Sequence, residues 1–119
     1  MDCSLKMDQI IDSDKALAGV GGNKAFLIEV IHAFMEDCEK HLRDIDLAID
    51  AGDAVTIRRA AHTIKGSADV IAASVTREAA QALEHHGREA RWEEIPEAAV
   101  TLKEALEQLL PELHRITEG

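Results

Sequence analysis

Residues that build sheets, disulfides and sharp chain breaks are scarce in this sequence. Its 119 residues include two Phe, one Trp, no Tyr, two Cys and two Pro. Alternating runs of β-branched and aromatic residues are absent, which argues against strands. Cys3 and Cys38 alone do not indicate a disulfide framework, and neither CxxC nor CxxCH occurs. The core must therefore come from Ala, Leu, Ile and Val, which suit close contacts between helices.

Positive charge and long apolar runs are scarce as well. The chain has 13 Lys and Arg against 23 Asp and Glu, a formal net charge of −10, so the whole molecule is repelled by phosphate backbones and anionic membranes. No stretch approaches the roughly 20 apolar residues of a membrane helix, and residues 1–6 lack the pattern of an export signal. We expect a cytoplasmic protein that binds neither nucleic acid nor membrane.

What the sequence does contain is apolar residues at helical spacing along nearly its whole length. Helices are predicted over residues 7–18, 23–51, 54 to 72 or 73, and 75–86, with a last one that begins between 92 and 96 and runs toward 116. Four substantial helices with short connections predict an all-α fold, an antiparallel four-helix bundle with a short additional N-terminal helix. Residues 1–119 are predicted to form a single domain, with residues 1–6 flexible.

Capping residues predict where these helices begin and end. Gly52 and Asp53 form the turn into the third helix, Ser74 caps the fourth and Gly87 ends it. Pro111 lies inside the last helix and predicts a kink or break there. The predicted buried side of that helix consists of Val100, Leu102, Leu106, Leu109, Leu110 and Leu113.

The third predicted helix carries the chemistry. Its apolar stripe consists of Ile57, Ala61, Ile64, Ala68 and Ile71. At about 100° per residue these positions stay within roughly 40° of one line, and His62 lies about 140° away from that line. His62 should therefore point outward, with Arg58 and Lys65 as neighbours on the helix surface. No acid occurs between Asp53 and Asp69, so the histidine lies in a basic island.

Gly66 follows the histidine by four residues and leaves a side chain out beside the imidazole, at a cost of about 1 kcal/mol of helix stability relative to Ala. An exposed imidazole, a nearby cation and a bare turn fit phosphoryl transfer to histidine. The neutral ring nitrogen would be the nucleophile, and the cations would balance phosphate charge. The residues alone leave two other interpretations open: His62 is a surface residue without a role, or Gly66 serves close packing of another helix.

This segment resembles the histidine phosphotransfer (HPt) domains of bacterial phosphorelays, whose core reads His, any residue, Leu or Ile, Lys, Gly and two small residues. The matching residues are Ala60-Ala61 and His62-Thr63-Ile64-Lys65-Gly66-Ser67-Ala68. The resemblance implies that His62 accepts a phosphoryl group through Nε2, that Lys65 balances its charge and that Gly66 gives the partner access. Glu84 matches a carboxylate that holds the other ring nitrogen in related domains; a plain surface Glu is the alternative.

The resemblance covers most of the chain and also implies partners. HPt domains take a phosphoryl group from the aspartate of one receiver domain and pass it to another, so the implied partners are response-regulator receiver domains and a hybrid sensor histidine kinase. Mg²⁺ belongs to the receiver, and this chain is expected to carry no metal or cofactor of its own. We expect a monomer. The third-helix residues expected to contact the receiver are Val55, Arg58, Arg59 and Asp69.

One position departs from the family pattern. Ala72 and Ala73 stand where the family often has Gly and then Ala. The departure affects the turn after the third helix and leaves the acceptor face untouched.

Two other classes of function compete with the carrier. A docking-only module would keep the fold and bind a receiver without accepting phosphate, but it would not need the imidazole. An enzyme is disfavoured because the chain has no glycine-rich nucleotide loop, no HExxH motif and no room for an ATP-binding domain. Whether the chain stands alone or is a domain of a larger hybrid kinase stays open.

Overall fold

The computed structural model describes residues 10–118. The predicted flexibility of residues 1–6, the predicted start of the first helix at residue 7, and Cys3 lie outside the described residues. Within the described residues the helices are α2 (Ser13–Gly19), α3 (Lys24–Ala51), α4 (Ala54–Val70), α5 (Ser74–Arg88) and α6 (Ile95–Glu118).

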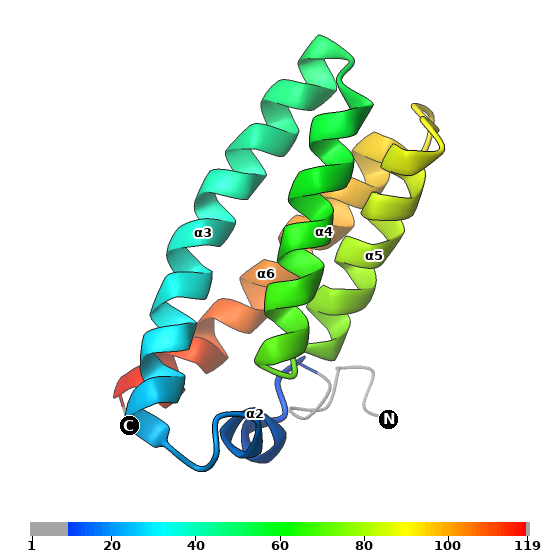
Figure 1. The fold of residues 1–119 in the computed structure, drawn as a ribbon. Coiled ribbons are helices and arrows are strands. Elements are labelled where there is room, and N and C mark those ends of the chain that lie inside the picture. The colour runs from blue at the N-terminus through cyan, green and yellow to red at the C-terminus, as the bar shows by residue number, and fades with distance from the viewer. Residues whose placement is uncertain (1–9, 119) are drawn as a thin grey trace, which may run out of the picture.

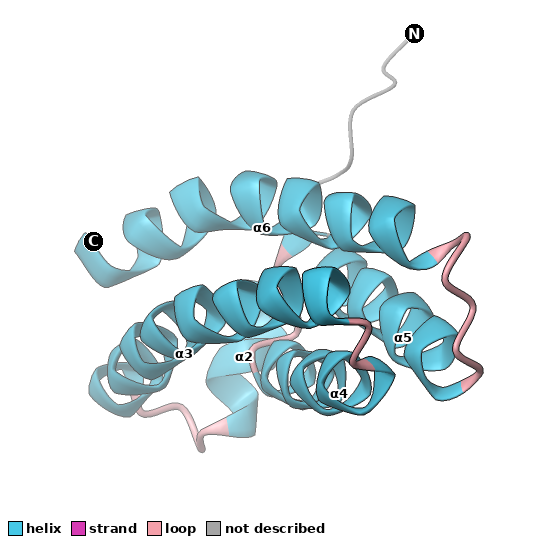
Figure 2. Ribbon diagram, turned by 90° about the horizontal axis from the view of Figure 1, so that it is seen from above, coloured by secondary structure: helices cyan, strands magenta, loops and turns pink. Residues whose placement is uncertain are grey.

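Helices α3 to α6 form the bundle, and α2 lies across one of its ends (Figure 1). Helix α4 packs between α3 and α5, and α6 contacts both α5 and α3. Successive helices of the bundle run in opposite directions and are joined by short turns, as Figure 2 also shows from above. A backbone hydrogen bond from Asp12 N to Ala72 O, 3.0 Å, ties the segment before α2 to the α4–α5 turn. The predicted all-α bundle with a short N-terminal helix is confirmed.

Aliphatic side chains fill the core, and small ones lie where the helices come closest. The whole predicted stripe of the third helix is buried: Ile57, Ala61, Ile64, Ala68 and Ile71. On α5 the buried apolar residues and glycine are Ala79, Ala80, Leu83 and Gly87. Since alanine and glycine keep the α4 and α5 axes close, side chains at the edge of one helix can reach those of the other.

The turn between α3 and α4 follows the predicted capping chemistry. Gly52 takes up the left-handed conformation, with φ 68° and ψ 34°, which glycine adopts without the penalty of a Cβ. The Asp53 carboxylate accepts a hydrogen bond from Thr56 N at 3.1 Å. Hydrogen bonds from the Thr56 hydroxyl and backbone N–H lower the pKa of Asp53. This cap begins α4 at residue 54 and thereby sets which face of the helix carries each later residue.

The predicted ends of the fourth helix were wrong at both positions. Ser74 is the first residue of α5 and not its cap, because Ala73, with a non-helical φ of −96° and ψ of 80°, precedes it and Ala73 O accepts the first helical hydrogen bond, from Arg77 N at 2.9 Å. Gly87 does not end the helix, which continues to Arg88. The glycine instead allows close packing against α4, as described below.

Helix α6 shows no break at Pro111, and it buries only part of the predicted apolar set. It continues through Pro111, which is exposed, so the Glu107 carbonyl that loses its helical partner lies on the solvent side, where water can bind it. Val100 and Leu110 are exposed, although both were predicted to be buried. The remaining leucines of the predicted set, Leu102, Leu106, Leu109 and Leu113, are buried.

The departure at Ala72 affects the turn that was predicted to change. Ala72 has a positive φ of 57°. Its N–H donates to Asp69 O at 3.1 Å, and the Ala73 N–H donates to Ala68 O at 2.9 Å, which is the Schellman pattern of a helix C-terminus. The end of α5 repeats the pattern at Ala90, with φ 52°. Alanine holds both turns at a conformational cost of about 1 kcal/mol that glycine would avoid.

Candidate functional site

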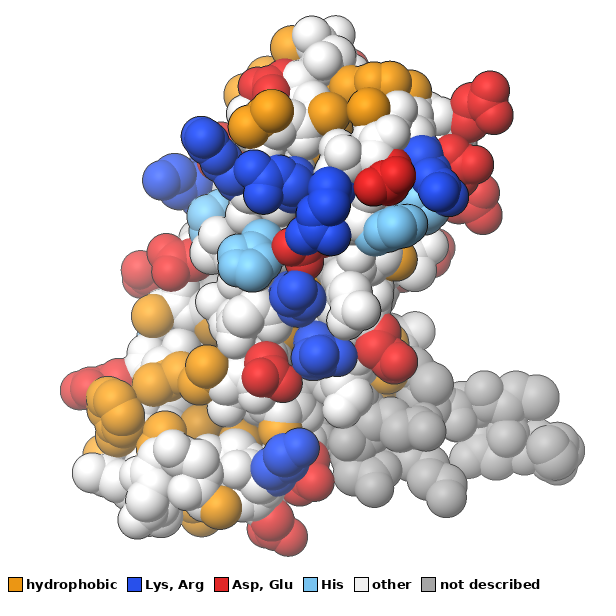
Figure 3. Space-filling model, turned by 45° about the vertical axis from the view of Figure 1, so that its right-hand side comes forward, with side chains coloured by type: hydrophobic (Ala, Val, Ile, Leu, Met, Phe, Trp, Pro, Cys, Tyr) orange, Lys and Arg blue, Asp and Glu red, His pale blue; other side chains and the backbone are white. Residues whose placement is uncertain are grey.

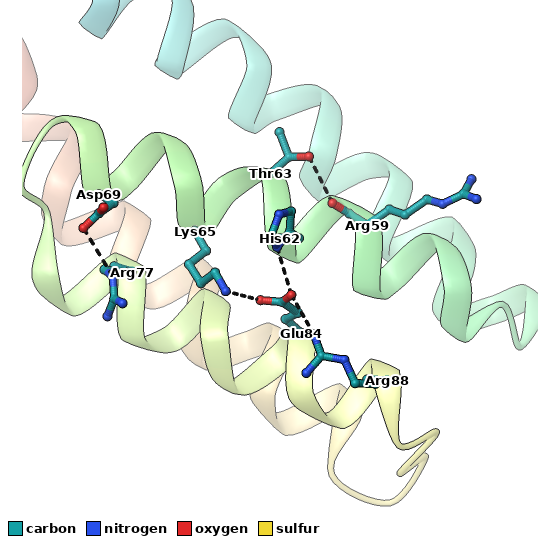
Figure 4. Close-up of polar contacts among 8 residues, drawn as sticks. All are labelled: Arg59, His62, Thr63, Lys65, Asp69, Arg77, Glu84 and Arg88. Atoms are coloured by element: carbon teal, nitrogen blue, oxygen red, sulfur yellow. Dashed lines mark hydrogen bonds and ion pairs between the residues drawn. The ribbon is translucent and has the colours of Figure 1, made fainter.

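His62 projects from the outer side of α4, close to the seam with α5 (Figure 4). Its neighbour Ala61 is fully buried, and the His62 side chain is 65% exposed. The predicted outward orientation is therefore confirmed. Because the imidazole lies on a regular helix turn rather than on a loop, a partner can reach it without a rearrangement of the backbone.

Glu84 of α5 holds one nitrogen of this ring, Nδ1. It lies on the inner edge of α5, its side chain is only 5% exposed, and its Oε2 atom lies 2.9 Å from His62 Nδ1. An ionised carboxylate can only accept a hydrogen bond. Nδ1 therefore carries the ring proton, and its N–H group donates a hydrogen bond to Glu84. In the neutral ring this leaves Nε2 without a proton, with its lone pair on the exposed side.

Two cations share the same carboxylate. Lys65 Nζ lies 2.7 Å from Glu84 Oε1, and Arg88 Nη2 lies 3.0 Å from Oε2. Burial acts to raise the pKa of Glu84, but the hydrogen bonds and charges of Lys65 and His62 outweigh it, so the pKa is lowered. Glu84 is therefore ionised at neutral pH and is not the plain surface residue that the sequence left as an alternative.

Two glycines near His62 lie in very different surroundings. A Cβ added to Gly66 would meet no atom within 4 Å, so the helix surface beside the imidazole is bare. A Cβ on Gly87 would lie 3.1 Å from the backbone nitrogen of Arg58 and 3.3 Å from the Ile57 side chain. Close packing at Gly87 brings α5 against α4 one helix turn from Glu84. The Glu84 carboxylate therefore lies within hydrogen-bond distance of the imidazole.

The other residues predicted to contact a partner surround the histidine unevenly. Val55 and Arg59 are exposed, and Arg58 is half-buried where Gly87 packs against it. Asp69 is exposed but pairs with Arg77 of α5 at 3.3 Å, farther along the seam. Figure 3 shows Lys and Arg side chains in a band beside the histidines on this face, although the net charge of the chain is −10.

Arg88 is the member of this cluster that the sequence did not predict. A signal for it was available, because Glu84 and Arg88 are four residues apart on one helix, a spacing typical of ion pairs. The signal was weak, since Glu84 becomes buried and pairs with His62 and Lys65 only when α5 packs on α4. Arg77 was missed for a different reason, because its partner Asp69 lies on another helix.

The described residues also limit what else this face can do. Between residues 10 and 118 no group of three or more His, Cys, Asp or Glu side chains is placed to hold a metal ion. No helix of this part of the chain is long and apolar enough to cross a membrane. Buried Cys38, whose pKa burial raises to about 12, is no nucleophile.

Comparison with known proteins agrees with this geometry. The sequence matches the family described as Hpt domain over residues 29–113. The fold is similar to the crystal structure of histidine-containing phosphotransfer protein B (HptB) from Pseudomonas aeruginosa PAO1, with a TM-score of 0.85 and 19% sequence identity over 92% of this chain and 95% of that chain. No curated protein matched in a sequence search. At this identity the structural likeness shows the fold, and the family match over most of the chain shows membership: the chain belongs to the Hpt domain family.

Proposed function

We propose that this Hpt domain is a phosphorelay carrier in which His62 accepts a phosphoryl group from a receiver-domain aspartate and passes it to a second receiver. The observation that carries the proposal is the asymmetry of the imidazole. Its Nδ1 is 2.9 Å from the buried Glu84 carboxylate, while the side chain as a whole is 65% exposed beside the bare turn at Gly66. This leaves a neutral nucleophile, Nε2, open to the partner.

The transfer step needs few groups from this chain. The Nε2 lone pair attacks phosphorus, and the bond between phosphorus and the receiver's aspartate oxygen breaks, so that the carboxylate leaves with the bonding electron pair. The ring becomes cationic, and its Nδ1–H continues to donate to Glu84. Reversal of these steps on a second receiver regenerates the neutral imidazole. The receiver supplies the Mg²⁺ that balances charge on the transferring group, and this chain brings no cofactor.

Lys65 and Gly66 have separate roles in this proposal. Lys65 is bound to Glu84 and its side chain is 25% exposed, so its charge acts on the phosphoryl group from a fixed position beside the ring. Gly66 admits the receiver surface that carries the aspartate and its metal ion. Arg58 and Arg59 add to the positive field on the same face, which favours an anionic donor.

The partners follow from the same face. Two receiver domains, one of them part of a hybrid sensor histidine kinase, would dock in turn over Val55, Arg58, Arg59 and Asp69. We expect the bundle, as a single domain over residues 1–119, to act as a cytoplasmic monomer, since apolar side chains from each described helix meet in one buried core. A docking-only module remains the second candidate, but the buried carboxylate beneath the imidazole has no purpose in it.

Transfer of labelled phosphate tests the proposal. Wild type and His62→Gln are incubated separately with a panel of receiver domains that carry labelled aspartyl phosphate. We expect label of acid-labile character on wild type alone, and equal helicity and melting of the two proteins, because the side chain is exposed. Binding of a receiver by wild type without any label would favour the docking-only module. Unfolding of His62→Gln would show that the histidine is part of the core.

A further inference from the structure

One oxygen of Glu84 receives two donors from different helices. Oε2 lies 2.9 Å from His62 Nδ1 and 3.0 Å from Arg88 Nη2, whereas Oε1 is bound by Lys65 at 2.7 Å. In Figure 4 the two cations lie on opposite sides of the carboxylate and the imidazole lies between them. The Arg88 side chain is 53% exposed, yet its guanidinium turns to the buried acid.

This arrangement balances two effects of a buried carboxylate on an imidazole. A carboxylate that accepts from Nδ1 orients the ring, but its charge also stabilises the protonated ring, which has no free nitrogen lone pair. Lys65 and Arg88 together place two positive charges on the one negative charge of Glu84. The carboxylate can still accept the hydrogen bond from Nδ1. Because its charge is offset by the two cations, it no longer stabilises the protonated imidazole strongly.

We propose that Arg88 is a positioning residue that acts on His62 through Glu84, and that its charge keeps the imidazole neutral while the carboxylate holds it in place. The consequence for transfer rests on the function proposed above; the consequence for the ring does not. Arg88 and Nδ1 touch the same oxygen and are therefore within about 6 Å of each other, where one charge shifts a protonation equilibrium by on the order of one pH unit.

Other charged groups near the ring belong to the helices packed around it. Besides Lys65, Arg58 and Arg59 lie on α4, and both add positive charge. On α3, Asp37 lines a shallow depression with Ser67 of α4. His41 and Asp44 of α3 are half-buried. On α5, Glu78, His85 and His86 line one pocket with Lys65, Glu84 and Arg88. Among residues 10–118, the cations that pair directly with Glu84 and offset its charge are Arg88 and Lys65.

A pair on α6 offers a matched control. Arg115 Nη1 lies 2.9 Å from Glu112 Oε1 on the same helix, and no histidine of the described residues pairs with that carboxylate. Arg115→Gln thus removes the same charge and an ion pair of the same kind at a site remote from His62. An ordinary surface pair of this type has a small effect on stability and none on a distant ring.

The test is a pH titration of His62 by NMR in wild type, Arg88→Gln, Arg88→Lys, Arg115→Gln, Glu84→Gln and the Glu84→Gln/Arg88→Gln double variant. We expect Arg88→Gln to raise the pH of half-protonation of His62, Arg88→Lys to restore it, and Arg115→Gln to leave it unchanged. In the Glu84→Gln background, removal of Arg88 should have a clearly smaller effect, because no carboxylate then holds the guanidinium beside the ring. An unchanged titration in Arg88→Gln, or an equal shift with and without Glu84, would overturn the inference.

Phosphotransfer from a receiver adds a second measurement. At neutral pH the initial rate for Arg88→Gln should fall about three- to tenfold and should recover as the pH rises, since the neutral ring is then regained. A loss that persists equally at every pH would mean that Arg88 contacts the partner or the phosphate itself, which would also overturn the inference. Failure of wild type to accept phosphate would remove the proposed function and leave the titration as a complete test.

Discussion

The two helical glycines beside His62 differ in what surrounds them. At Gly66 of α4, on the outer surface, an added Cβ would have no atom within 4 Å, whereas at Gly87 of α5 it would lie 3.1 Å from the Arg58 backbone. Both glycines cost helix stability. Gly66 therefore leaves room for a partner molecule, while Gly87 lets α4 and α5 pack closely against each other.

The two edges of the His62 imidazole also have different surroundings. Its Nδ1 faces the seam between α4 and α5, where Glu84, Lys65 and Arg88 form a charged cluster around one buried carboxylate. Its other edge faces the open surface beside Gly66. On the α5 side, the Glu84 carboxylate pairs with His62, Lys65 and Arg88, whereas the surface at Gly66 is bare. A phosphoryl carrier needs both properties at one side chain, because the ring must be held in place and still be reached.

Filling the open surface should have the largest effect on transfer. Gly66→Leu places a bulky side chain beside Nε2, and a steric penalty of about 3 kcal/mol in the docked complex corresponds to a loss of roughly 100-fold in rate. The fold should be unharmed, since leucine is a better helix former than glycine. Initial rates of phosphotransfer together with thermal melting test this, and full activity of Gly66→Leu would show that the bare turn is irrelevant to access.

Equal changes at the two glycines should have opposite effects on stability. Gly87→Ala should lower the free energy of unfolding by about 1 to 3 kcal/mol, because its Cβ has to push the α4 backbone away. Gly66→Ala should raise it by up to about 1 kcal/mol, because the added methyl group meets no neighbour. Denaturant unfolding of the two variants measures both values. A stabilising Gly87→Ala would contradict the close packing of the seam.

The seam should also make stability depend on pH. The pKa of Glu84 is lowered in the folded state, so the unfolded chain takes up this proton at a higher pH than the folded one does. The stabilisation from Glu84 is therefore present above its ordinary value of 4.5 and is lost as the pH falls through the lowered value. Wild type should lose more stability than Glu84→Gln over this acidic range. Parallel stability curves for the two proteins would argue against an ionised, paired Glu84.

The smallest expected effect lies outside both regions. Ala90 is exposed and holds a left-handed turn with φ 52°, so Ala90→Gly should stabilise the protein by about 0.5 to 1 kcal/mol. Phosphotransfer should be unchanged, because the substitution leaves the side chains that surround His62 in place. Denaturant unfolding measures the gain, and a destabilised Ala90→Gly would show that the alanine methyl group contributes more than the turn costs.

Sequence patterns were reliable where local rules decide the structure. Helical spacing predicted the bundle, the buried stripe of α4 predicted that His62 points outward, and the Gly52–Asp53 turn predicted where α4 begins. These features depend on residues within one or two helix turns of each other. The burial of Glu84 could only be expected from the family resemblance, because it depends on a contact between residues 22 positions apart.

The sequence was misleading where a tertiary contact decides. Gly87 looked like a helix end because glycine favours that position, but the close approach of Arg58 explains it better. Pro111 predicted a kink or a break, but α6 continues through it, and its exposed position lets water bind the freed carbonyl. The sequence did not predict a role for Arg88, because its partner Glu84 becomes a buried carboxylate only through packing against another helix.

Phosphate should enter at Nε2 of His62 while Glu84 holds Nδ1. The most direct measurement is NMR of ¹⁵N-labelled protein after phosphorylation by a receiver domain, with phosphorus–nitrogen coupling used to assign the bonded atom. We expect coupling to Nε2 of His62, with Nδ1 protonated. Coupling to Nδ1, or to a ring nitrogen of a different histidine such as His85, would contradict it.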